Sequence, residues 1–284
     1  MSTVHALRGP ALLFCPGNRP ERFAKAAAAA DTVILDLEDA VGPDGKDAAR
    51  DAVVAALSEL DPAATLVRIN APGSRWHDDD VAALAAHPDV AVMLPMATRA
   101  GDVTALAPRP VVALCETARG VLAAPEIADA PNCTGLMWGS EDLVADLGGR
   151  PGRAPGGGYR PAVEQARTRI LYAARAAGIT PVDTVLVAID DLDTLRLDSA
   201  AAVASGYAAK ACIHPKQVTV VREAFLPTDD EVADAREVLA AAGEHAGGVF
   251  RLHGRMIDAP VLAHAREVLR QAGADDPHAS EAVT

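Results

Sequence analysis

Eight short runs of apolar and β-branched residues alternate with alanine-rich segments of helical character, and this alternation restricts the fold more than any other feature. Continuous apolar strands are typical of parallel strands that helices cover on both faces. Eight such units in one chain predict a (β/α)8 TIM barrel, with a doubly wound sheet as the alternative. The expected strands are 11–15, 32–37, 65–69, 90–94, 111–115, 134–138, 184–189 and 209–213, and the expected helices lie near 20–30, 45–59, 78–86, 100–106, 121–129, 160–177, 192–204 and 216–224.

The remaining C-terminal residues predict an extension of the barrel. A helix near 229–242, with Thr228 or Asp229 as its cap, follows the eighth unit. The segment "GGVFRLHGRMIDAP" indicates a hairpin, and a last helix is expected near 260–272. We therefore expect a catalytic barrel over 1–228, a C-terminal helix–hairpin–helix extension or lid over 229–273, and a loose polar tail over 274–284.

Composition excludes several classes of partner. The formal net charge of −13, with no basic run, disfavours binding to nucleic acid and to anionic membranes. The N-terminus lacks the pattern of a signal peptide, and no apolar stretch approaches the length of a membrane span, so we expect a cytoplasmic protein. The four cysteines lie in or beside apolar runs without C-x-x-C spacing, and we interpret them as reduced, buried thiols.

Polar residues gather where the expected strands end. In parallel α/β folds the carboxyl ends of the strands meet at the edge that carries the active site. A ring of carboxylates there would repel itself unless a cation is bound among them. The residues at these ends are Asp36, Glu38 and Asp39 after the second strand, Arg68 and Asn70 at the third, Glu116 after the fifth, Glu141 and Asp142 after the sixth, Asp190 and Asp191 after the seventh, and His214 and Lys216 after the eighth.

Glu116 and Asp142 are the candidate metal ligands. Oxygen ligands with little histidine suit Mg²⁺ first and Mn²⁺ or Ca²⁺ next. Zinc is less suited, because the chain has no H-E-x-x-H motif and no cysteine cluster. Each residue also has a structural alternative: Glu116 could pair with Arg119 or Arg68, and Asp142 could cap the helix that follows its strand.

Arg68 is the second informative residue, because an arginine inside a core strand needs an anion. Its planar fork suits a carboxylate from the protein or from a small keto-acid or hydroxy-acid substrate. Asp36 is expected to support the site by hydrogen bonds. Asp190 and Asp191 are expected to cap a helix, and His214 to be structural. Nucleophilic alternatives are weak: there is no G-x-S-x-G, Lys210 starts its strand, and Lys216 fits the following helix.

The motifs taken together resemble one family. "LLFCPGNRPERFAKA", "VILDLEDAVGPDGKDAAR", "VRIN", "VMLP", "ETARGV", "WGSEDL", "CIHPKQ" and "GRMIDAPV" occur in the order found in the citrate lyase beta-subunit family, within the aldolase and citrate lyase superfamily. The resemblance covers about residues 11–264. It implies a (β/α)8 barrel, a bound Mg²⁺, carbon–carbon cleavage or formation at an acyl-CoA or acyl-carrier thioester, and a homotrimer.

The resemblance also assigns roles to individual residues. Glu116 and Asp142 match the metal ligands, and Arg68 matches the arginine that holds the keto acid. Asp258 matches a catalytic aspartate that reaches the neighbouring subunit's site in relatives. The CoA-binding region and the acidic pair lining the pocket correspond to Phe14, Arg19 and Lys25, and to Glu38 and Asp39, respectively.

These roles imply a Mg²⁺-dependent lyase that cleaves or forms a β-hydroxyacyl-CoA thioester such as citramalyl-, malyl- or citryl-CoA. Its products would be a 2-keto acid and an acyl-CoA. The alternatives are an aldolase acting on free hydroxy-keto acids, a citrate lyase subunit acting on a carrier-bound thioester, and a catalytically silent metal- or CoA-binding protein. Met96 stands where relatives commonly carry lysine ("LPMA" in place of "LPK"), which leaves the substrate open.

Overall fold

The computed structural model describes residues 7–155, 157–245 and 248–273. The chain divides between Arg222 and Glu223 into two compact units, and each is described by itself. The predicted tail over 274–284 lies outside the described residues.

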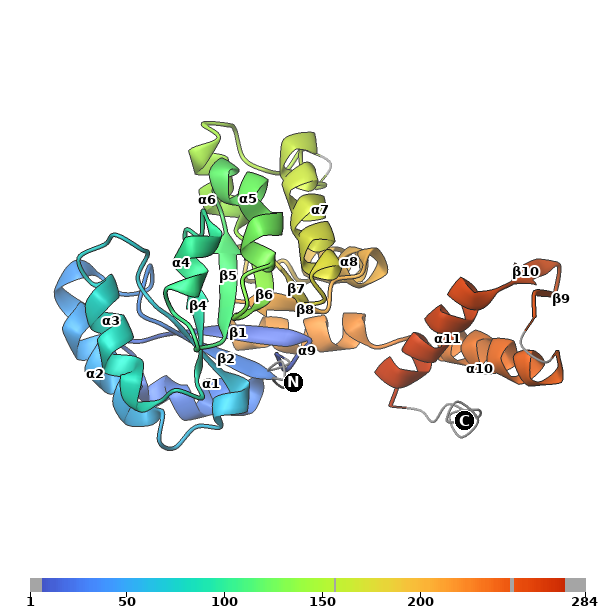
Figure 1. Cartoon of the computed structure of the whole chain (residues 1–284), viewed down its shortest axis with the longest axis horizontal. Coiled ribbons are helices and arrows are strands. Elements are labelled where there is room, and N and C mark those ends of the chain that lie inside the picture. The colour runs from blue at the N-terminus through green and yellow to red at the C-terminus, as the bar shows by residue number, and fades with distance from the viewer. Residues whose placement is uncertain (1–6, 156, 246–247, 274–284) are drawn as a thin grey trace. The chain divides into compact units, whose positions relative to one another are not determined.

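The first unit is a closed barrel of eight parallel strands in sequential order, in which the eighth strand pairs with the first (Figure 1). This confirms the predicted (β/α)8 architecture and excludes the doubly wound sheet. The strands are β1 (Ala11–Pro16), β2 (Thr32–Asp36), β3 (Thr65–Arg68), β4 (Ala91–Leu94), β5 (Val111–Cys115), β6 (Cys133–Trp138), β7 (Thr180–Asp183) and β8 (Ala209–Cys212).

Helices surround the barrel, so the strands are buried on both faces, as their apolar runs predict. The α-helices of this unit are α1 (Phe23–Ala29), α2 (Lys46–Ala56), α3 (His77–Ala83), α4 (Ala100–Thr104), α5 (Ala118–Ala128), α6 (Ser140–Asp146), α7 (Pro161–Ala176), α8 (Leu192–Ser205) and α9 (Pro215–Phe225), the last of which crosses the unit boundary. Short 3-10 turns cover Pro20–Arg22, Pro43–Gly45, Pro62–Ala64 and Leu84–Ala86.

The interior of the barrel is filled by one side chain or more from every strand. These residues form a single apolar cluster that closes the barrel axis. The cluster consists of Leu12, Ile34, Leu66, Met93, Val112, Leu114, Met137, Val182, Ala209 and Ala211, with Phe14 and Val185 among the partly buried residues packed against it.

The seventh strand was predicted wrongly. It covers Thr180–Asp183, and the apolar run 184–189 that was expected to form it is the loop that follows. The strand was not recognised in the sequence because it contains Pro181, and proline usually argues against a strand interior. Here its carbonyl still accepts from the N–H of Ala208. The helix α6 was also absent from the expected set, although a helix after the sixth strand was considered as one that Asp142 could cap.

Several polar predictions hold in this unit. Asp191 caps α8 by accepting from the N–H of Thr194, as predicted. The same prediction for Asp190 was wrong, because this residue precedes the cap, is exposed and lies 3.3 Å from Lys216 Nζ. Lys210 is fully buried and donates to Asp183 Oδ2 at 2.9 Å, so it ties β8 to β7. The four cysteines are free and buried, as predicted.

The second unit contains α10 (Asp229–Glu244), a two-stranded antiparallel hairpin of β9 (Phe250–Leu252) and β10 (Arg255–Ile257), and α11 (Ala259–Gln271). Thr228 caps α10 in a reciprocal capping box with Glu231. A small apolar core joins both helices to the hairpin.

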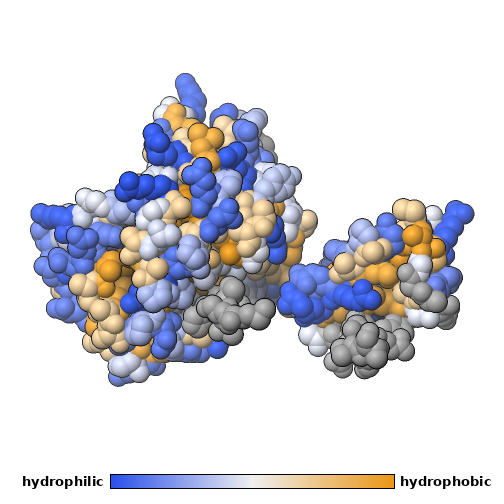
Figure 2. All heavy atoms as spheres, viewed as in Figure 1, coloured by the Kyte–Doolittle hydropathy of each residue, from blue (hydrophilic) through white to orange (hydrophobic). Residues whose placement is uncertain are grey.

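The visible surface carries hydrophilic side chains interrupted by small apolar areas (Figure 2). No helix within the described part of the chain is both long and apolar enough to cross a membrane.

Candidate active site

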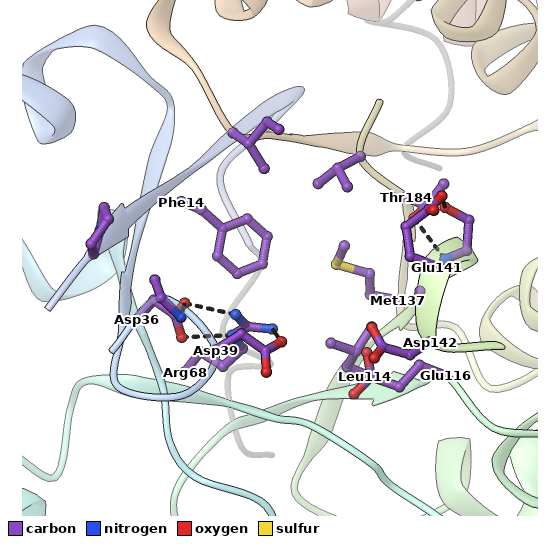
Figure 3. A pocket seen from close by; sticks show the side chains of 16 residues that line it. Phe14, Asp36, Asp39, Arg68, Leu114, Glu116, Met137, Glu141, Asp142 and Thr184 are labelled. Carbon is purple, nitrogen blue, oxygen red and sulfur yellow. Dashed lines mark hydrogen bonds and ion pairs between the residues drawn. The ribbon is translucent and has the colours of Figure 1, made fainter. Parts of the chain in front are cut away.

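A pocket of about 360 Å³ opens where the barrel strands end. Its walls come from the last residues of the strands and from the loops that follow them, which is where TIM barrels place their active sites. Figure 3 shows its charged side chains on two sides, with apolar side chains between them. The lining residues are Phe14, Pro16, Asp36, Asp39, Ala40, Arg68, Leu114, Glu116, Met137, Gly139, Ser140, Glu141, Asp142, Thr184, Val185 and Ile213.

Arg68, the last residue of β3, is held rigidly at one side of the pocket. Its Nε and Nη2 donate to the two carboxylate oxygens of Asp36 at 2.7 and 2.6 Å, a bidentate pair. The ring centre of Phe14 lies 4.9 Å from the guanidinium carbon. Asp36 therefore supports the site as predicted, and Nη1 of Arg68 remains on the other edge of the guanidinium.

The acidic pair after β2 divides between two environments. Asp39 is exposed, lines the pocket and lies 3.3 Å from Nη1 of Arg68. Glu38 is not among the pocket-lining side chains; its Oε2 lies 3.0 Å from Nη1 of Arg68 but makes no hydrogen bond. Burial, reinforced by the charges of Asp39 and Asp36 and opposed by Arg68, raises the pKa of Glu38 to about 7.

Lys46 holds the loop that carries this pair, a function that sequence reasoning missed. Its Nζ is buried and donates to the backbone oxygens of Leu37 and Glu38 at 2.7 Å each, and to Asn70 Oδ1 at 2.6 Å. It also lies 5.1 Å from the ring centre of Trp76. Asn70, expected at the rim, is buried in this network. The sequence showed only a lysine near the start of the second expected helix, which did not indicate that this lysine holds the loop.

Glu116 follows β5 and is 3% exposed. Its Oε1 accepts from the backbone N–H of Met96 at 2.8 Å, and Met96 itself has a left-handed φ of 50°. A side chain at Gly139 would lie 2.7 Å from the other oxygen, so glycine is required there for Glu116 to occupy this position. Burial, with the charges of Asp142 and Glu38, raises the pKa of Glu116 to about 8.

Asp142 lies in the first turn of α6, beside Glu116 (Figure 3). The N-terminal residue Ser140 of this helix is fixed by its N–H, which donates to Thr184 Oγ1 at 3.2 Å. Burial, then the charge of Asp39, raises the pKa of Asp142. The N-cap of α6 is Gly139, so Asp142 is not the cap.

These two carboxylates fit a hard divalent cation. Within the described ranges, neither Glu116 nor Asp142 forms an ion pair with a lysine or arginine, which removes Arg119 and Arg68 as structural partners of Glu116. The described part of the chain contains no group of three histidine, cysteine or acidic side chains that could enclose a metal. Two carboxylates with water and substrate completing the shell is the arrangement that Mg²⁺ commonly adopts.

Of the other predicted residues, one lies in the pocket and the rest lie outside its lining. Phe14 lines the pocket, but Arg19 and Lys25 are exposed and outside its lining. His214 accepts from the N–H of Lys216 and also lies outside the lining. Asp258, in the second unit, caps α11 by accepting from the N–H of Val261 at 3.4 Å.

Known proteins resemble this chain in sequence and in fold. Residues 11–215 match the model of the HpcH/HpaI aldolase/citrate lyase family, and residues 173–275 match that of a C–C bond lyase of the TIM-barrel fold. A (3S)-malyl-CoA thioesterase from Cereibacter sphaeroides is 36% identical over 276 residues, covering 93% of this chain and 94% of the relative.

Two solved structures from Mycobacterium tuberculosis are also similar. CitE in complex with magnesium, acetoacetate and coenzyme A has a TM-score of 0.89 and 49% identity, covering 94% of this chain and 98% of CitE. A citrate lyase beta subunit complexed with oxaloacetate and magnesium has a TM-score of 0.76 and 49% identity, covering 80% of this chain and all of the subunit. The chain therefore belongs to the HpcH/HpaI aldolase/citrate lyase family and is an enzyme of the carbon–carbon lyase class.

Proposed function

We propose that this enzyme cleaves, or forms, a β-hydroxyacyl-CoA thioester such as citramalyl-, malyl- or citryl-CoA, with a 2-keto acid and an acyl-CoA as the other side of the reaction. One observation carries the proposal. The buried Glu116 and the half-buried Asp142 lie side by side without a protein cation, in the same pocket as an arginine that Asp36 orients. A metal ion and a carboxylate-bearing substrate would complete this arrangement.

Glu116 and Asp142 would hold Mg²⁺, which would supply a Lewis acid for the hydroxyl oxygen that becomes the keto group. Arg68 would bind the substrate carboxylate through Nη1, in place of the exposed Asp39 that now accepts from this nitrogen at 3.3 Å, while Asp36 keeps the other two nitrogens. The pair with Asp36 holds the guanidinium in one orientation, so little side-chain entropy remains to be lost when substrate binds. Solved structures of relatives that contain magnesium with coenzyme A or a keto acid support this assignment.

Asp258 would be the general acid and base at the α-carbon of the thioester. In cleavage the hydroxyl proton passes to solvent as the oxygen becomes the keto group. The electron pair of the carbon–carbon bond passes to the α-carbon of the thioester, and Asp258 would protonate that carbon; in condensation it would remove the proton. Asparagine also caps helices, so Asp258→Asn should preserve α11. We expect kcat to fall on the order of 10²–10⁴-fold with Mg²⁺ affinity unchanged. Near-normal turnover would remove Asp258 from the mechanism.

A homotrimer in which Asp258 enters the neighbouring subunit's site can be tested by complementation. Asp258→Asn and Arg68→Ala subunits are each expected to be inactive alone. When mixed under conditions that exchange subunits, some sites would combine an intact Arg68 with an intact Asp258. Recovered activity would support sharing between subunits, and sedimentation analysis would count them. No recovery despite exchange would place both residues in one subunit's site.

Phe14, Arg19 and Lys25 are proposed to contact the CoA moiety. Phe14 lines the pocket, whereas the two exposed cations lie on the segment that follows β1. Arg19 and Lys25 would contact the negatively charged nucleotide end of CoA at the surface, outside the pocket. Arg19→Ala with Lys25→Ala should raise KM for a CoA thioester several-fold and leave Mg²⁺ binding unchanged; an unchanged KM would reject the assignment.

The test of the proposed function is Mg²⁺-dependent release of a keto acid from a panel of hydroxyacyl-CoA thioesters, with Asp142→Asn as the metal-site control. Thioester hydrolysis, the activity in the name of a 36% identical relative, would instead release free CoA without a keto acid. Cleavage of free hydroxy-keto acids, with no binding of acetyl-CoA, would favour the aldolase alternative. Reaction only with a carrier-bound thioester would favour a citrate lyase subunit.

A further inference from the structure

The charged side chains that line the pocket bear on how many carboxylates a bound keto acid can have. Arg68 is the single cationic side chain among the described residues that line the pocket, against five acidic ones. Asp36 occupies two of its three nitrogens, and the third, Nη1, donates to the exposed Asp39 at 3.3 Å and lies 3.0 Å from Glu38, so one substrate carboxylate can bind Nη1 in place of Asp39. The lining therefore offers a partner to one carboxylate and to no second.

A bound Mg²⁺ would not change this balance. Glu116 and Asp142 together match the charge of the ion that they are proposed to hold. The two acidic residues left at the rim, Asp39 and Glu141, would repel an additional anion. A ligand that brings a second carboxylate would meet either these side chains or the floor of the pocket.

The floor between the metal side and the Arg68 side is apolar. Leu114 and Met137 are each 2% exposed and belong to the cluster inside the barrel. Phe14 and Val185 pack against the same cluster, and Figure 3 shows Phe14 and Met137 between the two charged sides. A ligand that spans Arg68 and the metal would place its substituent over these side chains, where an unpaired carboxylate is costly and a methyl or methylene group is favourable.

We infer that the site selects 2-keto monocarboxylates with a small uncharged substituent, such as pyruvate, over 2-keto dicarboxylates such as oxaloacetate. This selection rests on the proposed function, and it narrows the thioester to one that yields a keto acid with a single carboxylate. A partly desolvated, unpaired carboxylate costs enough to change affinity by roughly 10- to 100-fold.

Calorimetric titration of the Mg²⁺-loaded full chain with pyruvate, 2-oxobutyrate and freshly dissolved oxaloacetate tests the inference. 2-Oxobutyrate controls for the size of the substituent. We expect pyruvate and 2-oxobutyrate to bind at least about tenfold more tightly than oxaloacetate. Oxaloacetate binding as tightly as pyruvate would overturn the inference, as would failure of all three to bind in the presence of Mg²⁺.

A gain-of-charge variant tests the cause. Ala40 lines the pocket and its side chain is exposed, so a longer residue there costs no packing. Ala40→Lys should shift the affinity ratio toward oxaloacetate by about tenfold, whereas Ala40→Gln, of similar length and no charge, should leave it unchanged. Equal ratios in both variants would overturn the electrostatic explanation.

Cleavage assays separate this inference from the proposed function. Citramalyl-CoA would release pyruvate, which lactate dehydrogenase detects, and citryl-CoA would release oxaloacetate, which malate dehydrogenase detects. Selective binding of pyruvate without cleavage of any thioester would reject the lyase proposal and preserve the selection of monocarboxylates. Cleavage of citryl-CoA as efficient as that of citramalyl-CoA would reject the selection and preserve the lyase.

Discussion

The metal-free enzyme should become more stable when Glu116 loses its charge. Folding raises the pKa of this carboxyl from its ordinary value of 4.5 to about 8, chiefly by burial. The folded state thus binds a proton more tightly than the unfolded state, and stability falls as pH rises from 4.5 to 8. At about 1.4 kcal/mol per pKa unit, the loss is on the order of 5 kcal/mol above pH 8 and about 2 kcal/mol at pH 6.

Glu116→Gln removes this penalty and keeps the contacts. The amide oxygen can still accept from the N–H of Met96, and the amide nitrogen can face Asp142. In EDTA we expect the variant to unfold at a higher temperature than the wild type, by roughly 10 °C at pH 8.5, with little difference at pH 5. Saturating Mg²⁺ should stabilise the wild type, by about 2.7 kcal/mol at one hundred times Kd, and leave the variant unchanged.

Scanning calorimetry at pH 5, 7 and 8.5, with and without Mg²⁺, measures these differences. Glu141→Gln is the matched control, because it removes one carboxylate from the same pocket at an exposed position. A Glu116→Gln variant that is less stable than the wild type at pH 8.5, or whose gain does not depend on pH, would refute the reasoning. So would a Mg²⁺ effect that survives the substitution.

Three further results are expected. Below pH 8 Glu116 must release a proton to bind Mg²⁺, so apparent affinity should rise about tenfold per pH unit up to that value and then level off; calorimetry in two buffers measures the proton, and a flat profile from pH 6 to 8 would contradict this. Lys46→Met leaves three acceptors without their donor and should cost about 2–4 kcal/mol in urea unfolding, whereas a change below about 0.5 kcal/mol would show the loop to be held otherwise. Gly139→Ala should displace Glu116 and weaken Mg²⁺ at least about tenfold, while Gly42→Ala, in open space, should not; equal affinities would reject the close fit.

The convergence of the charged residues could be predicted from sequence because strand order determines it. Arg68 ends one strand, and Glu116 and Asp142 follow two others. The carboxyl ends of parallel strands meet at one rim. The apolar runs identified seven of the eight strands. The remaining strand, β7 (Thr180–Asp183), was missed in favour of the more apolar loop that follows it. Leu186 of this loop is buried, but Val187 and Ile189 are exposed, so its apolar content does not mark a strand.

The supporting contacts could not be predicted in this way. Lys46 is nine residues from Leu37 and twenty-four from Asn70, and nothing in its neighbourhood marks it as buried. The close approach of Gly139 to Glu116 depends on the stagger between β5 and β6. Such contacts depend on how strands and helices pack, which no hydrophobic pattern reports. They also determine the pKa values that the charged residues acquire.

The most direct test of the account is a crystal structure of the full chain with Mn²⁺ and pyruvate, in which anomalous scattering locates the ion. We expect one ion in the pocket, about 2.0–2.3 Å from an oxygen of Glu116 and of Asp142, with the pyruvate carboxylate on Nη1 of Arg68. An ion bound without either carboxylate, or a pocket that stays empty at saturating Mn²⁺, would contradict the central claim that these two side chains form the metal site.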